Sequence, residues 1–167
     1  MHITVHDTLL RTTRRLFATL VTALDRAEAH AKQKNFDVAV LLNARLAPDM
    51  FPFTRQIQIA TDNAKGAAAR LAGIDMPKYE DNETTIEELR ARIVKTLSFV
   101  ESIEAAKYAG CEDRDVALPR RDGTLNLKGL DYFLGIALPN LYFHVTTAYA
   151  ILRHNGVDLG KKDFLAY

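Results

Sequence analysis

The sequence has few cysteines, little net charge and no long apolar run, which argues against disulfide bonds, nucleic-acid binding and a membrane-spanning helix. One cysteine, Cys111, occurs in 167 residues, so no internal disulfide can form. Lys and Arg total 22 against 21 Asp and Glu, and a net charge of +1 provides no broad field for nucleic acid or anionic membranes. The longest uncharged stretch near the C-terminus ends at Arg153, and it is too polar for a membrane-spanning helix because it includes Pro139 and His144.

Several common catalytic motifs are also missing. The chain has no glycine-rich phosphate loop, no C-x-x-C pair, no H-E-x-x-H and no serine in a nucleophile elbow. Its 48% hydrophobic and 26% charged residues are ordinary for a globular protein. We therefore expect one domain over residues 1–167, located in the cytoplasm. The composition does not decide whether the chain is an enzyme.

Apolar residues recur at spacings of three and four along four segments, which predicts four long amphipathic helices. The first is expected over residues 5–34. The second is expected to start near Pro48 or at Pro52 and to end at Gly73. The third is expected over residues 85–106, and the last from Pro139 to His154. Such a pattern favours an all-α four-helix bundle.

Between the third and last helices the helical pattern fails. Residues 116–127 predict a small β-hairpin with Asp122-Gly123 at its turn. The apolar tail over residues 157–167 is expected to dock onto the bundle. Residues 75–104 carry eight acids and four bases, and we interpret these acids as a solvated outer face.

His144 is the residue best suited to chemistry. A neutral imidazole in the last helix is able to bind a metal or act as a general base. The alternative is a structural histidine hydrogen-bonded to Asn140, Thr147 or a backbone carbonyl.

Arg55 and Gln58 share one face of the second long helix, because they are three positions apart in the sequence. The planar guanidinium of Arg55 is suited to a carboxylate or phosphate. The alternatives are a salt bridge to Asp49 or simple exposure to water.

Two sequence strings resemble the uncharacterised DUF1993 family. One is LAPDMFP at residues 46–52, followed by Arg55 and Gln56; the other is LPNLYFH at residues 138–144. The family belongs to the DinB/YfiT-like superfamily. The resemblance implies an up-down-down-up four-helix bundle, often dimeric, and it assigns Asp49, Arg55, Asn140 and His144 as motif matches.

Superfamily members often hold a divalent metal with three histidines, one on the second helix and an H-x-x-x-H pair on the last. Here His144 matches the first histidine of the pair, but Ala148 stands where the second is expected. The second helix contains no histidine at all. Since a first-row metal site needs at least three good protein ligands, we predict no tightly bound metal or other cofactor.

The resulting hypothesis is a small-molecule-binding bundle with a pocket between the second and last helices. In it, Arg55 holds an anionic group, His144 acts as general acid or base, and Asn140 orients the imidazole. Asp49, Gln58 and Tyr149 complete the predicted site.

Two alternatives stand beside this hypothesis. One is a non-catalytic dimeric interaction protein, with Ala67, Ala68 and Ala69 as a candidate dimer seam. The other is a divergent metal-dependent transferase or hydrolase that uses His144 with Asp49 or Asp62. The predicted partners are a second copy of the chain and a small molecule, with no nucleic acid and no membrane.

Overall fold

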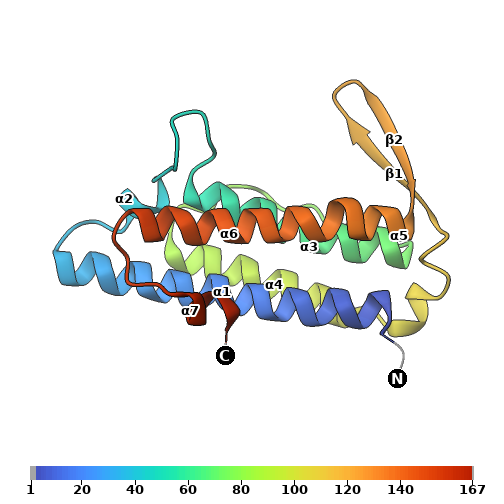
Figure 1. Cartoon of the computed structure of the whole chain (residues 1–167), viewed down its shortest axis with the longest axis horizontal. Coiled ribbons are helices and arrows are strands. Elements are labelled where there is room, and N and C mark those ends of the chain that lie inside the picture. The colour runs from blue at the N-terminus through green and yellow to red at the C-terminus, as the bar shows by residue number, and fades with distance from the viewer. Residues whose placement is uncertain (1–2, 167) are drawn as a thin grey trace.

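The computed structural model describes residues 3–166, and within them four long helices pack side by side along the long axis (Figure 1). These helices are α1 (Val5–Lys34), α3 (Phe53–Ala72), α4 (Ile86–Ser102) and α6 (Leu138–His154). Helix α3 packs against α4 and α6, and α1 packs against the same two helices. The chain is therefore mostly helical, as predicted.

Helix ends follow local sequence signals closely. Helix α1 ends at Asn35, which adopts a left-handed conformation, and α3 ends at Gly73, also left-handed at φ 67°. At the start of α4, the side chain of Thr85 accepts from the amide of Glu88 while the Glu88 carboxylate accepts from the amide of Thr85. These predicted helices are confirmed, although α4 ends at Ser102 rather than near residue 106.

The start of α3 differs from the first of the two expected positions. Residues 46–52 form a loop, and Pro52 is the extended residue before the helix. Proline suits this place because it has no amide hydrogen to leave without a partner. The short segment before the loop forms α2 (Ala39–Leu42).

The predicted hairpin is present as β1 (Asp115–Arg120) and β2 (Gly123–Lys128), and it extends away from the bundle (Figure 1). Its register pairs Leu118 with Leu125 and Arg120 with Gly123. The two turn residues are therefore 121–122, and Gly123 opens the second strand at φ 140° instead of lying inside the turn.

The last helix does not start as a separate element at Pro139, because it continues from the helical residues before it. Helical backbone runs from α5 (Gly129–Tyr132) through a π-helical segment, η2 (Phe133–Ala137), directly into α6. A π-helical turn changes the backbone bonding pattern before Pro139, where the ordinary α pattern would need the missing amide hydrogen.

Short elements close the structure. A 3₁₀ turn, η1 (Ala105–Tyr108), follows α4, and the tail forms α7 (Lys161–Leu165). The hydroxyl of Thr19 on α1 donates to the carbonyl of Phe164 over 2.6 Å, so the tail docks as predicted.

The core lies between the long helices and contains fully buried side chains such as Phe17, Phe53, Leu89 and Val145. The three successive alanines of α3, at positions 67–69, belong to this interior and are at most 2% exposed. Their predicted role as a dimer seam is therefore wrong: small side chains let helices approach within one chain. No helix within residues 3–166 has the length and apolar character needed to cross a bilayer.

Candidate functional site

His144 on α6 faces Gln56 on α3. The imidazole Nδ1 lies 2.8 Å from Gln56 Oε1, while Gln56 Nε2 donates to the backbone carbonyl of Phe51 over 3.0 Å. Because that carbonyl only accepts, it fixes the orientation of the Gln56 amide. The Nδ1 atom of His144 must then carry the proton, and Nε2 of the neutral ring keeps its lone pair.

The environment keeps the imidazole neutral. Partial burial lowers the pKa of His144 from its ordinary value of 6.5, and the positive charge of Arg55 lowers that pKa further. No hydrogen-bond partner for Nε2 occurs among residues 3–166. The half-buried ring therefore offers an unprotonated nitrogen that can accept a proton or a hydrogen bond near neutral pH.

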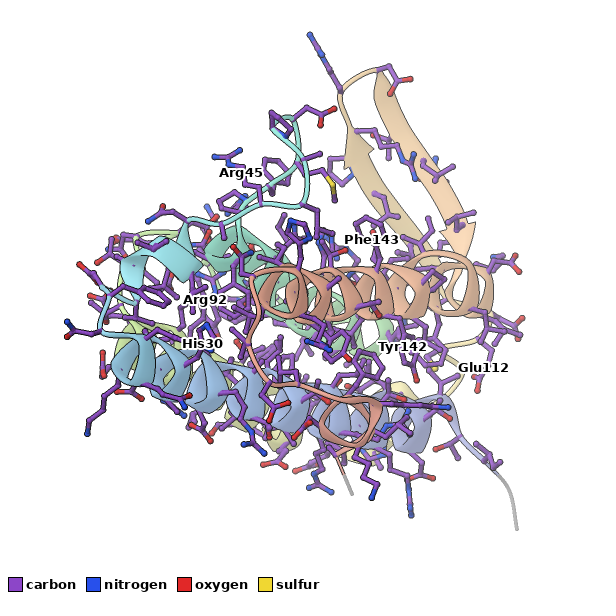
Figure 2. All side chains as sticks on the ribbon, turned by 60° about the vertical axis from the view of Figure 1, so that its left-hand side comes forward. His30, Arg45, Arg92, Glu112, Tyr142 and Phe143 are labelled. Carbon is purple, nitrogen blue, oxygen red and sulfur yellow. The ribbon has the colours of Figure 1, made fainter. Side chains whose placement is uncertain are left out.

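An aromatic surface flanks this histidine. The Phe143 ring contacts the His144 ring edge-on, with centroids 5.2 Å apart, and is 56% exposed. Figure 2 shows Phe143 on the side of α6 that faces the loop carrying Arg45, whereas Tyr142 points toward α1. The Tyr142 hydroxyl accepts from Arg15 of α1 over 3.2 Å, so only Phe143 belongs to the outward surface.

Arg55 lies in the first turn of α3. Its Nη1 donates to Gln58 Oε1 over 3.1 Å and also contacts the carboxylate of Asp81, and its guanidinium lies 6.0 Å from the centre of the Phe51 ring. Pro52, the residue before the helix, has no side chain that caps the free amides of this turn. The partial positive charge at the N-terminus of α3 and the guanidinium charge of Arg55 therefore lie close together.

A cavity of about 370 Å³ opens beside Arg55 and Gln58. Its walls come from the end of α2, the start of α3 and the segment before α4, and they include Leu42, Asn43, Phe51, Pro52, Thr54, Asp81, Glu83 and Thr84. Burial alone would raise the pKa of Asp81, but hydrogen bonds and charges from Arg55 and Arg92 hold it below its ordinary value of 3.8. Asp81 is therefore an anion at neutral pH, bound to Arg55.

Arg92 is the most heavily bonded side chain of the region, and its role was not predicted from the sequence. Arg92 on α4 is 3% exposed and lies inside the bundle (Figure 2). Its guanidinium donates to Thr61 over 2.7 Å, to Asp62 over 2.8 Å and to Glu83 over 2.9 Å. The carboxylate of Asp81 lies 3.0 Å away.

Lys65 completes this buried charge network. Its side chain is 4% exposed, its Nζ lies 2.7 Å from Asp62, and the same atom lies 3.6 Å from the centre of the Tyr79 ring. The acidic stretch before α4 therefore does not form only a solvated face, because Asp81 and Glu83 turn toward Arg92. The run of three acids and one amide at residues 80–83 is the sequence signal that indicates a nearby buried cation.

The predicted site residues divide into two groups. Arg55 and Gln58 line one cavity, and the charge of Arg55 acts on His144. The other three lie elsewhere. Asp49 is exposed on the loop before α3. Tyr149 packs edge-on against Phe164, with ring centroids 5.7 Å apart, and so supports the C-terminal tail.

Asn140 does not orient the imidazole. It is exposed, and its side-chain amide donates to the carbonyl of Ile136 over 2.9 Å. The predicted role is therefore wrong, and Gln56 performs it. The residues around His144 do not indicate Gln56 as its partner, because Gln56 lies 88 residues away in the sequence.

The residues present do not fit the three-histidine metal site of the superfamily. Ala148 lies one turn after His144, where the second histidine of the pair is expected. The residue that faces His144 from α3 is Gln56 and not a histidine. Asp62, the alternative ligand, is held by Lys65 and Arg92. In the part of the chain that the structure describes, no group of three or more His, Cys, Asp or Glu side chains is placed to hold a metal ion.

Comparison with known proteins agrees with this architecture. A crystal structure of a DinB family member protein from Shewanella denitrificans superposes with a TM-score of 0.87 and is 45% identical, covering 94% of this chain and 88% of that one. No curated protein matches significantly. The family model of DUF1993, a domain of unknown function, matches residues 5–165, and the chain therefore belongs to the DUF1993 family.

Proposed function

We propose that the chain binds a small anionic molecule, without a tightly bound metal, in the cavity at the start of α3. Arg55 holds the anionic group, and Gln58 orients it. The observation that carries the proposal is the contact between Arg55 and the Asp81 carboxylate at this cavity, since it presents a guanidinium already aligned with an anion. A ligand carboxylate or phosphate would replace Asp81 there.

His144 supplies the chemical group of the proposed site. Its neutral ring, with Nδ1 held by Gln56, keeps an acid or base position at Nε2, and the charge of Arg55 acts on this ring although His144 does not line the cavity. Whether this group catalyses a reaction or only accepts a hydrogen bond depends on the ligand. A cavity of about 370 Å³ is of the size that small metabolites fill.

The proposal assumes the up-down-down-up helix order that the family resemblance implies. In that order the second and last long helices are neighbours, and the packing of α3 against α6 supports it. We further propose a cytoplasmic protein that forms homodimers.

Binding of inorganic phosphate and of succinate tests the ligand class. The Cε1–H resonance of His144 is followed by NMR while either anion is added to the full chain. We expect a saturable shift that Arg55→Gln weakens about tenfold or more, since it removes a charge-assisted hydrogen bond. Arg11→Gln, a matched charge removal on the exposed side of α1, should change nothing.

A second variant separates binding from folding. Asp81→Asn removes the carboxylate that competes for Arg55, so anion affinity should rise. Equal affinity of wild type and Arg55→Gln for both anions, or no shift at His144 at all, would overturn the proposal.

The dimeric interaction protein remains a second candidate because of one observation. Phe51 and Phe143 are each 56% exposed, and Leu134 is 55% exposed on the same helical run as Phe143. Light scattering of the purified chain tests the dimer that both candidates share, and a monomer would remove this candidate. A stable dimer that Phe143→Ser dissociates and that binds neither phosphate nor succinate would favour it over the anion-binding proposal.

Elemental analysis of protein purified without an affinity tag tests the metal-dependent alternative. We expect substoichiometric zinc, nickel, iron and manganese, and no change in melting temperature on adding zinc or nickel. One bound metal per chain that His144→Ala removes would contradict the metal-free proposal.

A further inference from the structure

A second cavity lies farther along α3, away from Arg55 and His144. Its volume is about 510 Å³, and it opens between α3, the π-helical segment at the start of α6, the loop around Tyr79 and strand β1. Its lining includes the cations Lys65, Arg70 and Lys78 and the single acid Asp62. The cavity is thus richer in positive than in negative charge.

Lys65 and Asp62 neutralise each other over 2.7 Å, which leaves Arg70 as the important cation of the wall. Arg70 is half-buried, and its Nη1 donates to the hydroxyl of Tyr132 over 3.3 Å. No carboxylate of residues 3–166 lies within 4.0 Å of its guanidinium. An arginine has five N–H donors, so most of those of Arg70 are available to a ligand.

Neighbouring residues hold this guanidinium in place. Its centre lies 5.9 Å from the centre of the buried Tyr132 ring. Gly66 provides the room on α3, because a Cβ atom at that position would lie 2.5 Å from Arg70 Nη1 and 3.3 Å from the sulfur of Met76. The position of Arg70 therefore depends on a glycine inside a helix, where alanine would otherwise be more favourable.

Much of the remaining wall is apolar, although Asn63 and Asn140 also line the cavity. Met76, Pro77, Leu118 and Ile136 line the cavity, and Ile136 belongs to the π-helical segment. Such irregular helical turns frequently occur at functional sites. A half-buried cation without an acid, set in an apolar wall, matches a ligand that has one charged end and one apolar body.

We propose that this cavity is a binding site for an amphipathic anion, with Arg70 holding a carboxylate or phosphate and Met76, Leu118 and Ile136 contacting an aliphatic body. Lys78, exposed at the rim, adds attraction at longer range. The site is separate from the cavity of the proposed function, because Arg55, Gln58 and His144 do not line it.

Titration calorimetry with octanoate and octyl phosphate tests the site and distinguishes the two anion sources. We expect one of them to bind the wild-type chain and 1-octanol to bind at least about tenfold more weakly, since the alcohol cannot pair with Arg70. Acetate and inorganic phosphate, which lack the apolar body, should also bind weakly. Arg70→Gln should weaken octanoate or octyl phosphate about tenfold, whereas Arg153→Gln on the exposed end of α6 should not.

Methyl NMR locates the ligand. The Met76 methyl resonance should shift on binding, while that of Met50, on the loop before α3, should not. Gly66→Ala keeps every charge but displaces Arg70, so it should weaken binding while the chain stays folded. Equal binding of octanol and octanoate, undiminished binding in Arg70→Gln, a shift at Met50 in place of Met76, or no binding of either anion would each overturn the proposal.

Discussion

Helix α3 packs against α4 on one side and against α6 on the other. The polar side chains at these two contacts differ in how many of their hydrogen-bonding groups already have a partner. Toward α4, Arg92 and Lys65 are almost fully buried; Arg92 contacts the carboxylates of Asp62, Asp81 and Glu83, and Lys65 pairs with Asp62. Toward α6, His144 and Arg70 are half-buried and keep free bonding capacity. A buried charge without partners is too costly to keep, whereas a half-buried group can exchange water for a ligand. The buried charges toward α4 therefore hold the fold, whereas the half-buried groups toward α6 can still bind a ligand.

The largest effect should come from removing the centre of the α4 side. Arg92→Ala leaves Asp62, Asp81 and Glu83 near one another without their shared cation. We expect a loss of about 3–5 kcal/mol in the free energy of unfolding. Urea denaturation followed by circular dichroism measures it.

Arg14→Ala is the matched control for Arg92→Ala. Arg14 pairs with Glu101 over 2.7 Å, but the two side chains are 54% and 38% exposed. Such surface pairs contribute at most about 1 kcal/mol. Similar losses for the two variants would show that burial does not distinguish these arginines.

On the α6 side, Gln56→Ala should give a smaller loss. Gln56 is 2% exposed and connects the Phe51 carbonyl with His144. Without it, the Phe51 carbonyl and the half-buried Nδ1–H group of His144 both lose their partner, which should lower the unfolding free energy by about 1–3 kcal/mol. Gln33→Ala on the exposed surface of α1 should leave it nearly unchanged. If Gln56→Ala leaves the free energy of unfolding unchanged, water must replace both hydrogen bonds of the amide.

The same contrast between the two sides explains which helices and which site residues the sequence could predict. Periodic apolar residues and end signals such as Thr85, Gly73 and Asn35 act within a few residues, so the long helices follow directly from the sequence. His144 and Arg55 were identified from the chemistry of the imidazole and guanidinium groups and from the resemblance to the DUF1993 strings. Gln56 was not, because its partner depends on how two distant helices are rotated against each other.

Arg92 was missed for a related reason. Polar residues Arg90 and Lys95 surround it in sequence, and an arginine there is typical of a solvated helix face. Its burial arises from the segment before α4, which folds back over α3 and carries Asp81 and Glu83 to it. Partners nine, eleven and thirty residues away neutralise this charge, so the residues next to Arg92 carry no sign of its burial, and only the acids within residues 80–83 indicate it.

A further effect on the α6 side concerns pH. Burial lowers the pKa of His144 below 6.5, so the unfolded chain binds more protons than the folded chain just below that pH. The unfolding free energy should therefore fall as pH drops below 6.5, until the pKa of the folded state is passed. His144→Gln should remove this component. Urea denaturation at several pH values compares the two chains, and identical pH profiles would contradict a lowered pKa.

The smallest effect isolates the charge of Arg55 from burial. Arg55→Gln should raise the pKa of His144, because it removes the nearby positive charge, but burial should still keep that pKa below 6.5. Arg153→Gln removes an equal charge from an exposed position of the same helix as His144. NMR titration of His144 in the three chains distinguishes them. An unchanged pKa in Arg55→Gln would mean that the guanidinium acts on Asp81 alone, and it would separate the two residues on which the proposed anion site is built.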